Sequence, residues 1–252
     1  MKKILMALFL VLLLATTISV EGKNHNAQQN VQQNSNVNSE IKGGHHNTIV
    51  TNVDQISQIE VGNNNNIPYG QLKKSAALTT NGEMTNINLN QNAIINNQIL
   101  GGHHNVIAVD NNQLAALDGS SPTANWGMRN LNLNQNAFID NQIFGGHHNV
   151  IAVDNNQLAS LNYFLSPTTW ETGNLNLDQT AVIDNQIRGG HHNVIVVGST
   201  QQAYMNGMMP RDTSVNVTQG VYNSNQIVGG HHNVISVDTK QVVKLGSIAD
   251  ES

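Results

Sequence analysis

The pentapeptide Gly-Gly-His-His-Asn occurs five times in this chain of 252 residues, beginning at Gly43, Gly101, Gly145, Gly189 and Gly229. These copies contain ten of the eleven histidines, and their first glycines lie 58, 44, 44 and 40 residues apart. Self-similarity at a nearly fixed period is the sequence signature of repeat proteins, whose units bury their apolar faces against one another. The pattern therefore predicts a tandem array in which whatever the histidines do is done five times.

The residues before each Gly-Gly pair alternate strictly in character, which is typical of a β-strand. In the third copy, every second residue of the segment 133–143 falls on one face, which reads Leu-Gln-Ala-Ile-Asn-Ile, and the opposite face is mostly polar. The same columns recur in the other copies, including the degenerate first one at 31–41. A second alternating segment follows each turn, for example 105–111, and its less polar face holds Val106 and Ala108. This second strand is a candidate for burial on both sides.

Glycine adopts positive φ angles without steric cost, so the Gly-Gly pair suits a reversal of the chain. The reversal is either a hairpin, whose strands hydrogen-bond to each other, or an arch, whose strands face each other across a core. Proline removes a donor from a strand ladder, and all four prolines lie in the connectors between units, at Pro68, Pro122, Pro167 and Pro210. The chain is accordingly predicted to be all-β, a β-solenoid or stacked array of five strand–Gly-Gly–strand repeats.

Asn and Gln make up about a quarter of the chain, and some of them fall in the columns that should be buried. A buried amide without a hydrogen-bond partner costs about 1–3 kcal/mol, but identical strands stacked in register let each amide bond to the next. One predicted ladder contains Gln33, Gln91, Gln135, Gln179 and Gln219, and a second contains Asn47, Asn105, Asn149, Asn193 and Asn233. The alternative, a disordered Asn-rich chain, does not require five copies of a period-two pattern.

The chain begins with features of a secretory signal peptide, predicted over residues 1–22. Lys2 and Lys3 precede an apolar run that ends at Ala15, and small residues follow. An uncleaved N-terminal anchor is the alternative. The remaining predicted regions are an Asn/Gln-rich segment at 23–30, the five repeats with their connectors at 31–245, and a tail at 246–252. The mature chain is expected to be secreted, extracellular or at the cell surface, with no membrane span after cleavage.

Composition narrows the function classes. The chain has no cysteine, so an exported form is held by its core, its ladders or its assembly rather than by disulfides. The net charge is −5, with 11% charged residues, which argues against a nucleic-acid partner because such a partner requires a basic surface. No nucleophile–base pair, paired carboxylates or phosphate-binding loop recurs in the repeats, so we do not expect an enzyme.

The repeat resembles the curlin repeat of curli-type secreted amyloid fibres, which has the style Gln-x-Gly-x-x-Asn-x-Ala-x-Val-x-Gln. The segment Asn-Val-Ile-Ala-Val-Asp-Asn at 105–111 is similar to its second strand, and Gln-Asn-Ala-Phe-Ile-Asp-Asn at 135–141 is similar to its first. The units here are longer than the curlin repeat and carry a histidine pair at each turn. The resemblance implies an extracellular fibre subunit used in a matrix or in adhesion.

Adjacent residues of a strand point to opposite faces, so one histidine of each pair is expected to line the turn and the other to face solvent. Stacking would form two columns of imidazoles: His45, His103, His147, His191 and His231, and His46, His104, His148, His192 and His232. Three roles stay open: hydrogen-bond caps of the turn, ligands of Zn, Cu or Ni, and pH sensing through repulsion in acid. Asp110, Asp154 and Asp238 recur six residues after the second histidine, but Gly198 takes that place in the fourth copy.

We therefore expect an exported structural protein, a subunit of an extracellular amyloid-like fibre or matrix that serves adhesion or biofilm formation. Its expected partners are further copies of itself or homologous fibre subunits, and no cofactor is required. One alternative is a monomeric solenoid that binds Zn, Cu or Ni through the stacked histidines. A second alternative is an ice- or surface-binding solenoid that uses its flat Asn-rich face.

Overall fold

The computed structural model describes residues 5–15, 27–61, 76–80, 84–119, 130–163, 174–207 and 214–246. Every regular element within these ranges is a β-strand, and no helix in them is long and apolar enough to cross a membrane. The strands are β1 (Leu5–Ala15), β2 (Ala27–Lys42), β3 (His46–Val61), β4 (Ala76–Thr80), β5 (Met84–Leu100), β6 (His104–Gly119), β7 (Asn130–Phe144), β8 (His148–Tyr163), β9 (Asn174–Arg188), β10 (Asn193–Gly207), β11 (Ser214–Val228) and β12 (Val234–Lys244).

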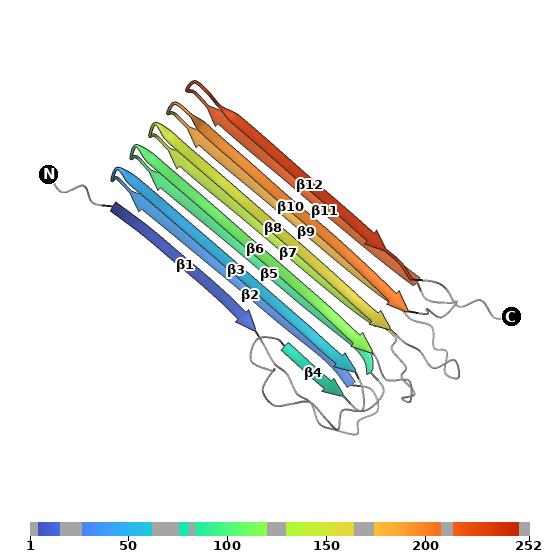
Figure 1. The fold of residues 1–252 in the computed structure, drawn as a ribbon. Helices are drawn as coiled ribbons and strands as arrows, with labels where there is room; N and C mark the ends of the chain where they lie inside the picture. Colours follow the sequence, from blue (N-terminus) through green and yellow to red (C-terminus); the bar gives the residue numbers. More distant parts are fainter. Residues whose placement is uncertain are drawn as a thin grey trace.

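The strands form two sheets that face each other (Figure 1). Sheet I holds the strand before each Gly-Gly pair, in the order β11-β9-β7-β5-β2. Sheet II holds the strand after each pair, in the order β1-β3-β6-β8-β10-β12, with β4 paired to β3. Because the two strands of one repeat lie in different sheets, each reversal is an arch and not a hairpin. The predicted all-β stack of five repeats is confirmed.

Neighbouring strands of each sheet are parallel and pair with their sequence equivalents one repeat away. In sheet I, Gln91 of β5 pairs with Gln33 of β2 and with Gln135 of β7. In sheet II, Asn105 of β6 pairs with Asn47 of β3 and Asn149 of β8. Parallel strands need a crossover connection, which here is the opposite sheet's strand together with a connector. Every column of the sequence thus becomes a row of stacked side chains, and we call the two strands of one repeat a rung.

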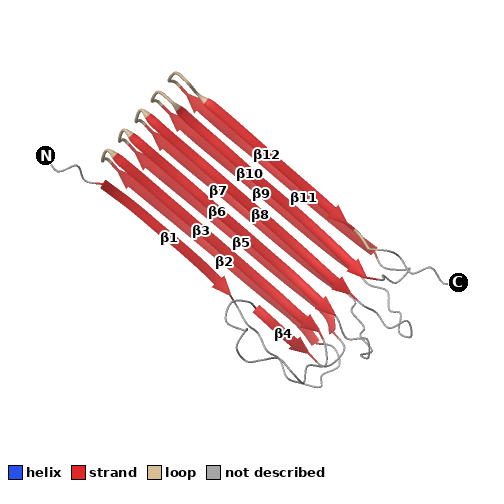
Figure 2. Ribbon diagram, in the orientation of Figure 1, coloured by secondary structure: helices blue, strands red, loops and turns tan. Residues whose placement is uncertain are grey.

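The core between the sheets consists of two apolar clusters. The cluster nearest the arches contains Ile95, Ile99 and Ile107, and the cluster at the far end contains Leu89 and Leu117, each with its equivalents in other rungs. Along both strands of a rung, a glutamine column lies between the two clusters. The arches lie in a row at one end of the strands, along one side of the stack, as Figure 2 shows by their tan turns.

Two strands lie outside the five repeats. Strand β4 belongs to the first connector and pairs with the end of β3, from Ser57 to Val61. Strand β1 lies within the predicted signal peptide and pairs in parallel with β3, from Leu5 opposite His46 to Ala15 opposite Ile56. Cleavage of residues 1–22 stays a prediction. The lysines at 2 and 3, the four connector prolines and most of the predicted tail at 246–252 lie outside the described residues.

Candidate functional site

The arch depends on its two glycines in different ways. Both adopt positive φ in every copy, for example +89° at Gly145 and +93° at Gly146. A Cβ on Gly146 would lie 2.5 Å from Asn105 Nδ2 and 2.6 Å from Asn149 Oδ1. A Cβ on Gly145 would lie 3.6 Å from Gly101 Cα, an ordinary contact distance. The first glycine is therefore required by backbone conformation alone, and the second also by space.

The interior of the arch is occupied by the asparagine of each pentapeptide. Asn149 is buried, and its Nδ2 donates to Asn193 Oδ1 at 2.9 Å and to the carbonyl of Gly145 at 2.9 Å. The ladder continues through all five copies, with Nδ2–Oδ1 distances of 3.0 Å from Asn47 to Asn105 and 3.0 Å from Asn193 to Asn233. The predicted asparagine ladder is present. Its amides form hydrogen bonds to one another and to the carbonyl oxygen of a turn glycine.

All ten histidines of the pentapeptides are exposed, so the prediction that one of each pair lines the turn is wrong. The reversal of the backbone comprises the two glycines and the first histidine. After it, asparagine is the first residue whose side chain points into the arch. The imidazoles stack face to face in two columns, with centroid distances of 5.1, 5.2, 5.4 and 5.3 Å in the His45 column. In the His46 column the distances are 4.7, 4.8, 4.9 and 4.8 Å.

The interpretation of the histidines as hydrogen-bond caps is also wrong, since no imidazole in the described ranges forms a hydrogen bond and asparagine bonds the turn carbonyls instead. For metal binding, the lone pair of an imidazole lies in its ring plane. Stacked rings such as His104 and His148, only 4° from parallel, keep their lone pairs in two parallel planes that do not meet at a common ion. The described residues also hold no group of three or more His, Cys, Asp or Glu that could bind a metal. Ligation of Zn, Cu or Ni stays a prediction that requires the rings to turn out of the stack.

The stacking has an electrostatic consequence. Desolvation lowers the pKa of His104, and repulsion by the imidazoles of His148 and His46 lowers it further. Desolvation and the neighbouring His232 likewise lower the pKa of His192. The folded chain therefore favours the neutral forms of His104 and His192. On the same face of sheet II, desolvation and the neighbouring Asp154 raise the pKa of Asp110.

The predicted glutamine ladder is present in sheet I. Gln135 Nε2 lies 2.9 Å from Gln91 Oε1, and Gln135 Oε1 accepts from Gln179 at 2.7 Å. The same Nε2 lies 2.9 Å from the carbonyl of Gln113 and 3.1 Å from that of Leu158, both in sheet II. The ladder therefore bonds the two sheets to each other as well as one rung to the next.

Sheet II contains a matching ladder that the sequence analysis missed. It consists of Gln55, Gln113, Gln157, Gln201 and Gln241, each linked to the one before at 2.8 Å. The sequence does carry a signal for this ladder, because a glutamine recurs at the same distance in sequence after each pentapeptide.

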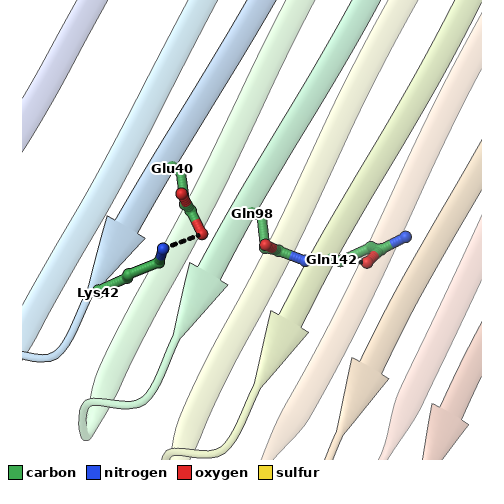
Figure 3. Close-up of polar contacts among 4 residues, drawn as sticks. All are labelled: Glu40, Lys42, Gln98 and Gln142. Carbon is green, nitrogen blue, oxygen red and sulfur yellow. Dashed lines mark hydrogen bonds and ion pairs between the residues drawn. The ribbon is translucent and has the colours of Figure 1, made fainter.

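The outer face of sheet I carries further polar columns. Examples are the bonds from Asn134 to Asn90 at 2.7 Å and from Gln98 to Gln142 at 3.2 Å. Figure 3 shows Gln98 and Gln142 beside the ion pair of Glu40 and Lys42, whose charged atoms are 3.0 Å apart. A shallow polar depression lies over these columns. Its amides satisfy one another, and they form no nucleophile–base arrangement.

The two ends of the stack are chemically incomplete. In the end rung, formed by β11 and β12, Ile235 is 46% exposed, whereas its equivalent Ile195 one rung inward is 0% exposed. At the opposite end, Asn47 Oδ1 is buried and accepts no hydrogen bond. Strand β2 is the edge strand of sheet I, and β11 and β12 are edge strands at the other end.

No protein-family model, curated protein or solved structure matches this chain.

Proposed function

We propose that the protein is an exported structural subunit of an extracellular amyloid-like fibre or matrix, used in surface adhesion or biofilm formation. In this proposal the fibre grows when the end rung of one copy stacks on β2 and β3 of the next. The observation that carries the proposal is the exposure of core columns at the end rung, including Ile235 and Val243 at 46% and 44%. Edge strands of this kind are templates for pairing with another chain.

The columns at the two ends are compatible in chemistry. In sheet I, extrapolation of the register places Val217 on Val31, Gln219 on Gln33 and Ile227 on Ile41 of the next copy. In sheet II the same extrapolation places Ile235 on Ile49 and Gln241 on Gln55. Both glutamine ladders and both apolar clusters would therefore continue across the junction.

The hydrogen bonds of the asparagine ladder give the junction a direction. Each Nδ2 donates to the Oδ1 of the following rung, as Asn193 does to Asn233 at 3.0 Å. This leaves Oδ1 of Asn47 buried without a donor at the first rung. In a stacked pair of chains, Asn233 Nδ2 of one copy would donate to Asn47 Oδ1 of the next. Addition of subunits would therefore be head to tail.

The experiment that tests the proposal uses residues 23–252, the predicted mature chain, in a chelator at neutral pH, viewed by negative-stain electron microscopy. Unbranched fibres support it. The variant Ile235→Lys places a charge on the end rung and should prevent elongation. The matched control Val234→Lys is on the same strand and is similarly exposed in the parent, at 53% against 46%. Its side chain belongs to the outer face of sheet II and not to the core between the sheets, so its fibres should persist.

A chain that stays monodisperse would contradict the proposal. Stoichiometric uptake of Zn, Cu or Ni by that monomer would favour the metal-binding solenoid, for which the exposed and unbonded imidazole columns are the supporting feature. Thermal hysteresis would favour ice binding through the Asn-rich face of sheet I.

A further inference from the structure

The outer face of sheet II beside the arches carries two columns of small, mostly apolar side chains, in which Thr48 and Ser236 are the polar members. We call it the valine–alanine face; its columns are Thr48, Val106, Val150, Val194 and Val234, and Val50, Ala108, Ala152, Val196 and Ser236. Val106 and Val150 are only partly buried, and Val196 is 44% exposed. The sequence makes this strand a candidate for burial on both sides, but no described residue covers its outer side. The outer face of sheet I differs, because much of it consists of amides that bond to one another.

A column of histidines flanks this face on one side, and a column that contains aspartates flanks it on the other. In β6 the outward residues are, in order, His104, Val106, Ala108 and Asp110, and the partly buried or exposed positions of the sequence follow this alternation. In β8 they are His148, Val150, Ala152 and Asp154. The histidine column and this second column thus lie at equal distances on either side of the two apolar columns. The second column, called the aspartate column here, holds Asp110, Asp154 and Asp238, with Asn52 and Gly198 in the other two rungs.

We propose that the valine–alanine face pairs with the same face of a second copy, with the strands antiparallel across the contact and both stacks pointing the same way. A two-fold axis parallel to the stack produces this arrangement, in which every contact occurs twice. Val106 then lies opposite Ala108 of the second copy, so that large and small side chains interdigitate in a dry interface. His104 lies opposite Asp110, and His148 lies opposite Asp154.

The charges decide between the two possible orientations. If the strands were parallel across the contact, aspartate would face aspartate, and like charges in direct opposition are unfavourable. The antiparallel orientation instead places an imidazole, which has an N–H donor whether or not it is protonated, opposite a carboxylate acceptor. The other charged groups near this face are few: the next outward column of sheet II holds Asp54 and Lys240, while Lys42 and Arg188 lie on the outer side of sheet I.

This pairing deepens the proposed function, because it would make each fibre a pair of stacks, but it uses a surface distinct from the stack ends. The two can therefore be tested apart. The non-elongating variant Ile235→Lys of the predicted mature chain should sediment as a dimer at pH 6 even though it forms no fibres. A sample that remains monomeric at concentrations at which fibres of the parent chain show two stacks would overturn the pairing through this face.

The face itself is tested with a matched pair of substitutions. Val150→Lys adds a charge to the valine–alanine face, and Val182→Lys adds the same charge at a partly buried outward position of sheet I. Mass per length measured by scanning transmission electron microscopy should fall about twofold for Val150→Lys fibres and stay unchanged for Val182→Lys fibres. Unchanged mass per length in Val150→Lys fibres would overturn the inference and leave the proposed function standing.

The orientation is tested by exchanging charges at pH 6. His148→Asp alone sets aspartate against Asp154 of the second copy at both symmetric contacts and should shift the sedimenting species to monomer. The double variant, His148→Asp with Asp154→His, restores the complementary arrangement and should restore the dimer. His147→Asp, in the neighbouring imidazole column, is the control and should leave the dimer intact. If the double variant stayed monomeric, the antiparallel orientation would be wrong.

Discussion

Gln135 shows why a buried polar residue is tolerated in this core. Its Nε2 has acceptors at 2.9, 2.9 and 3.1 Å and its Oε1 has a donor at 2.7 Å, so the desolvated amide is fully bonded. Each bond reaches a different strand. The same side chain buried in an isolated strand would be unfavourable, because its amide would lack hydrogen-bond partners. In the stack, its bonds fix the register of one rung on the next.

We therefore expect Gln135→Leu to lower the free energy of unfolding by about 3 kcal/mol. The substitution leaves buried Gln91 Oε1 without its donor and removes the acceptor that lies 2.7 Å from Gln179 Nε2. The matched control Gln142→Leu removes an outward amide and should change the free energy by about 0.5 kcal/mol or less. Urea unfolding in the non-elongating Ile235→Lys background measures both. Equal losses in the two variants would contradict the role of the buried ladder.

The two arch glycines give a second prediction at the residue scale. Gly145→Ala should cost about 1–2 kcal/mol, because an L-residue is placed at positive φ without a steric clash. Gly146→Ala should cost clearly more, because its Cβ would also displace the amides of Asn105 and Asn149. Urea unfolding would rank the pair. Hydrogen exchange at the asparagine ladder should rise only for Gly146→Ala, and an increase of equal size in both variants would contradict this account.

At this scale the sequence predicted which amides stack but not where the histidines point. The amide columns follow from strict alternation along straight strands. The direction of the histidines depends on the backbone of the arch, where even His192 and His232 adopt φ of 56° and 58°, and alternation does not extend through such a reversal. The second glutamine ladder does not follow from the alternating segment that ends at Asn111, because Gln113 lies two residues beyond it.

At the scale of elements, β1 has a consequence for assembly. It occupies the edge of β3 on which the end rung of another copy would stack in the proposed fibre. The chain 1–252 can therefore dock its own β11 and β12 on a growing fibre but presents a covered edge afterwards. We expect small amounts of the chain 1–252, added to seeds and an excess of residues 23–252, to shorten the fibres.

The measurement is the distribution of fibre lengths by electron microscopy. The control is Ile235→Lys in the chain 1–252, which should not dock and should not shorten the fibres. Shortening by both proteins would mean that residues 1–22 act by a route other than edge pairing.

The arrangement of the strands was only partly predictable, because the choice between a hairpin and an arch depends on contacts between repeats. Hairpins and arches both satisfy a period-two pattern with a glycine reversal, and residues such as Ile107 and Ile139 are apolar in either case. The choice between them is made by partners one repeat away in sequence, at separations of 44 or more residues in the central copies. The sequence of one segment does not show which strand it pairs with, although the fixed period of the repeats predicts that partners one repeat away exist.

At the scale of the whole molecule, the stacked imidazoles predict a pH response of the unpaired stack. The pKa values of His104 and His192 are lowered in the fold, so the unfolded chain binds protons first as the pH falls through about 6.5. Stability is then lost as the pH falls toward the folded-state pKa. The raised pKa values of Asp110 and Asp140 act in the opposite sense, because their protonation relieves buried charge, but only at the lower pH where carboxyl groups titrate.

The free energy of unfolding of the Ile235→Lys monomer should therefore fall between pH 7.5 and pH 5, and the decline should level off or partly reverse near pH 4. Urea unfolding at dilutions that keep the chain monomeric measures this profile. Replacing His104, His148 and His192 together by Asn, which tolerates the left-handed backbone of His192, should flatten the decline between pH 7.5 and 5 and leave the carboxyl-dependent part unchanged. Equal stability of the parent at pH 7.5 and 4.5, with no minimum between them, would mean that the histidine columns accept protons without opposing the fold.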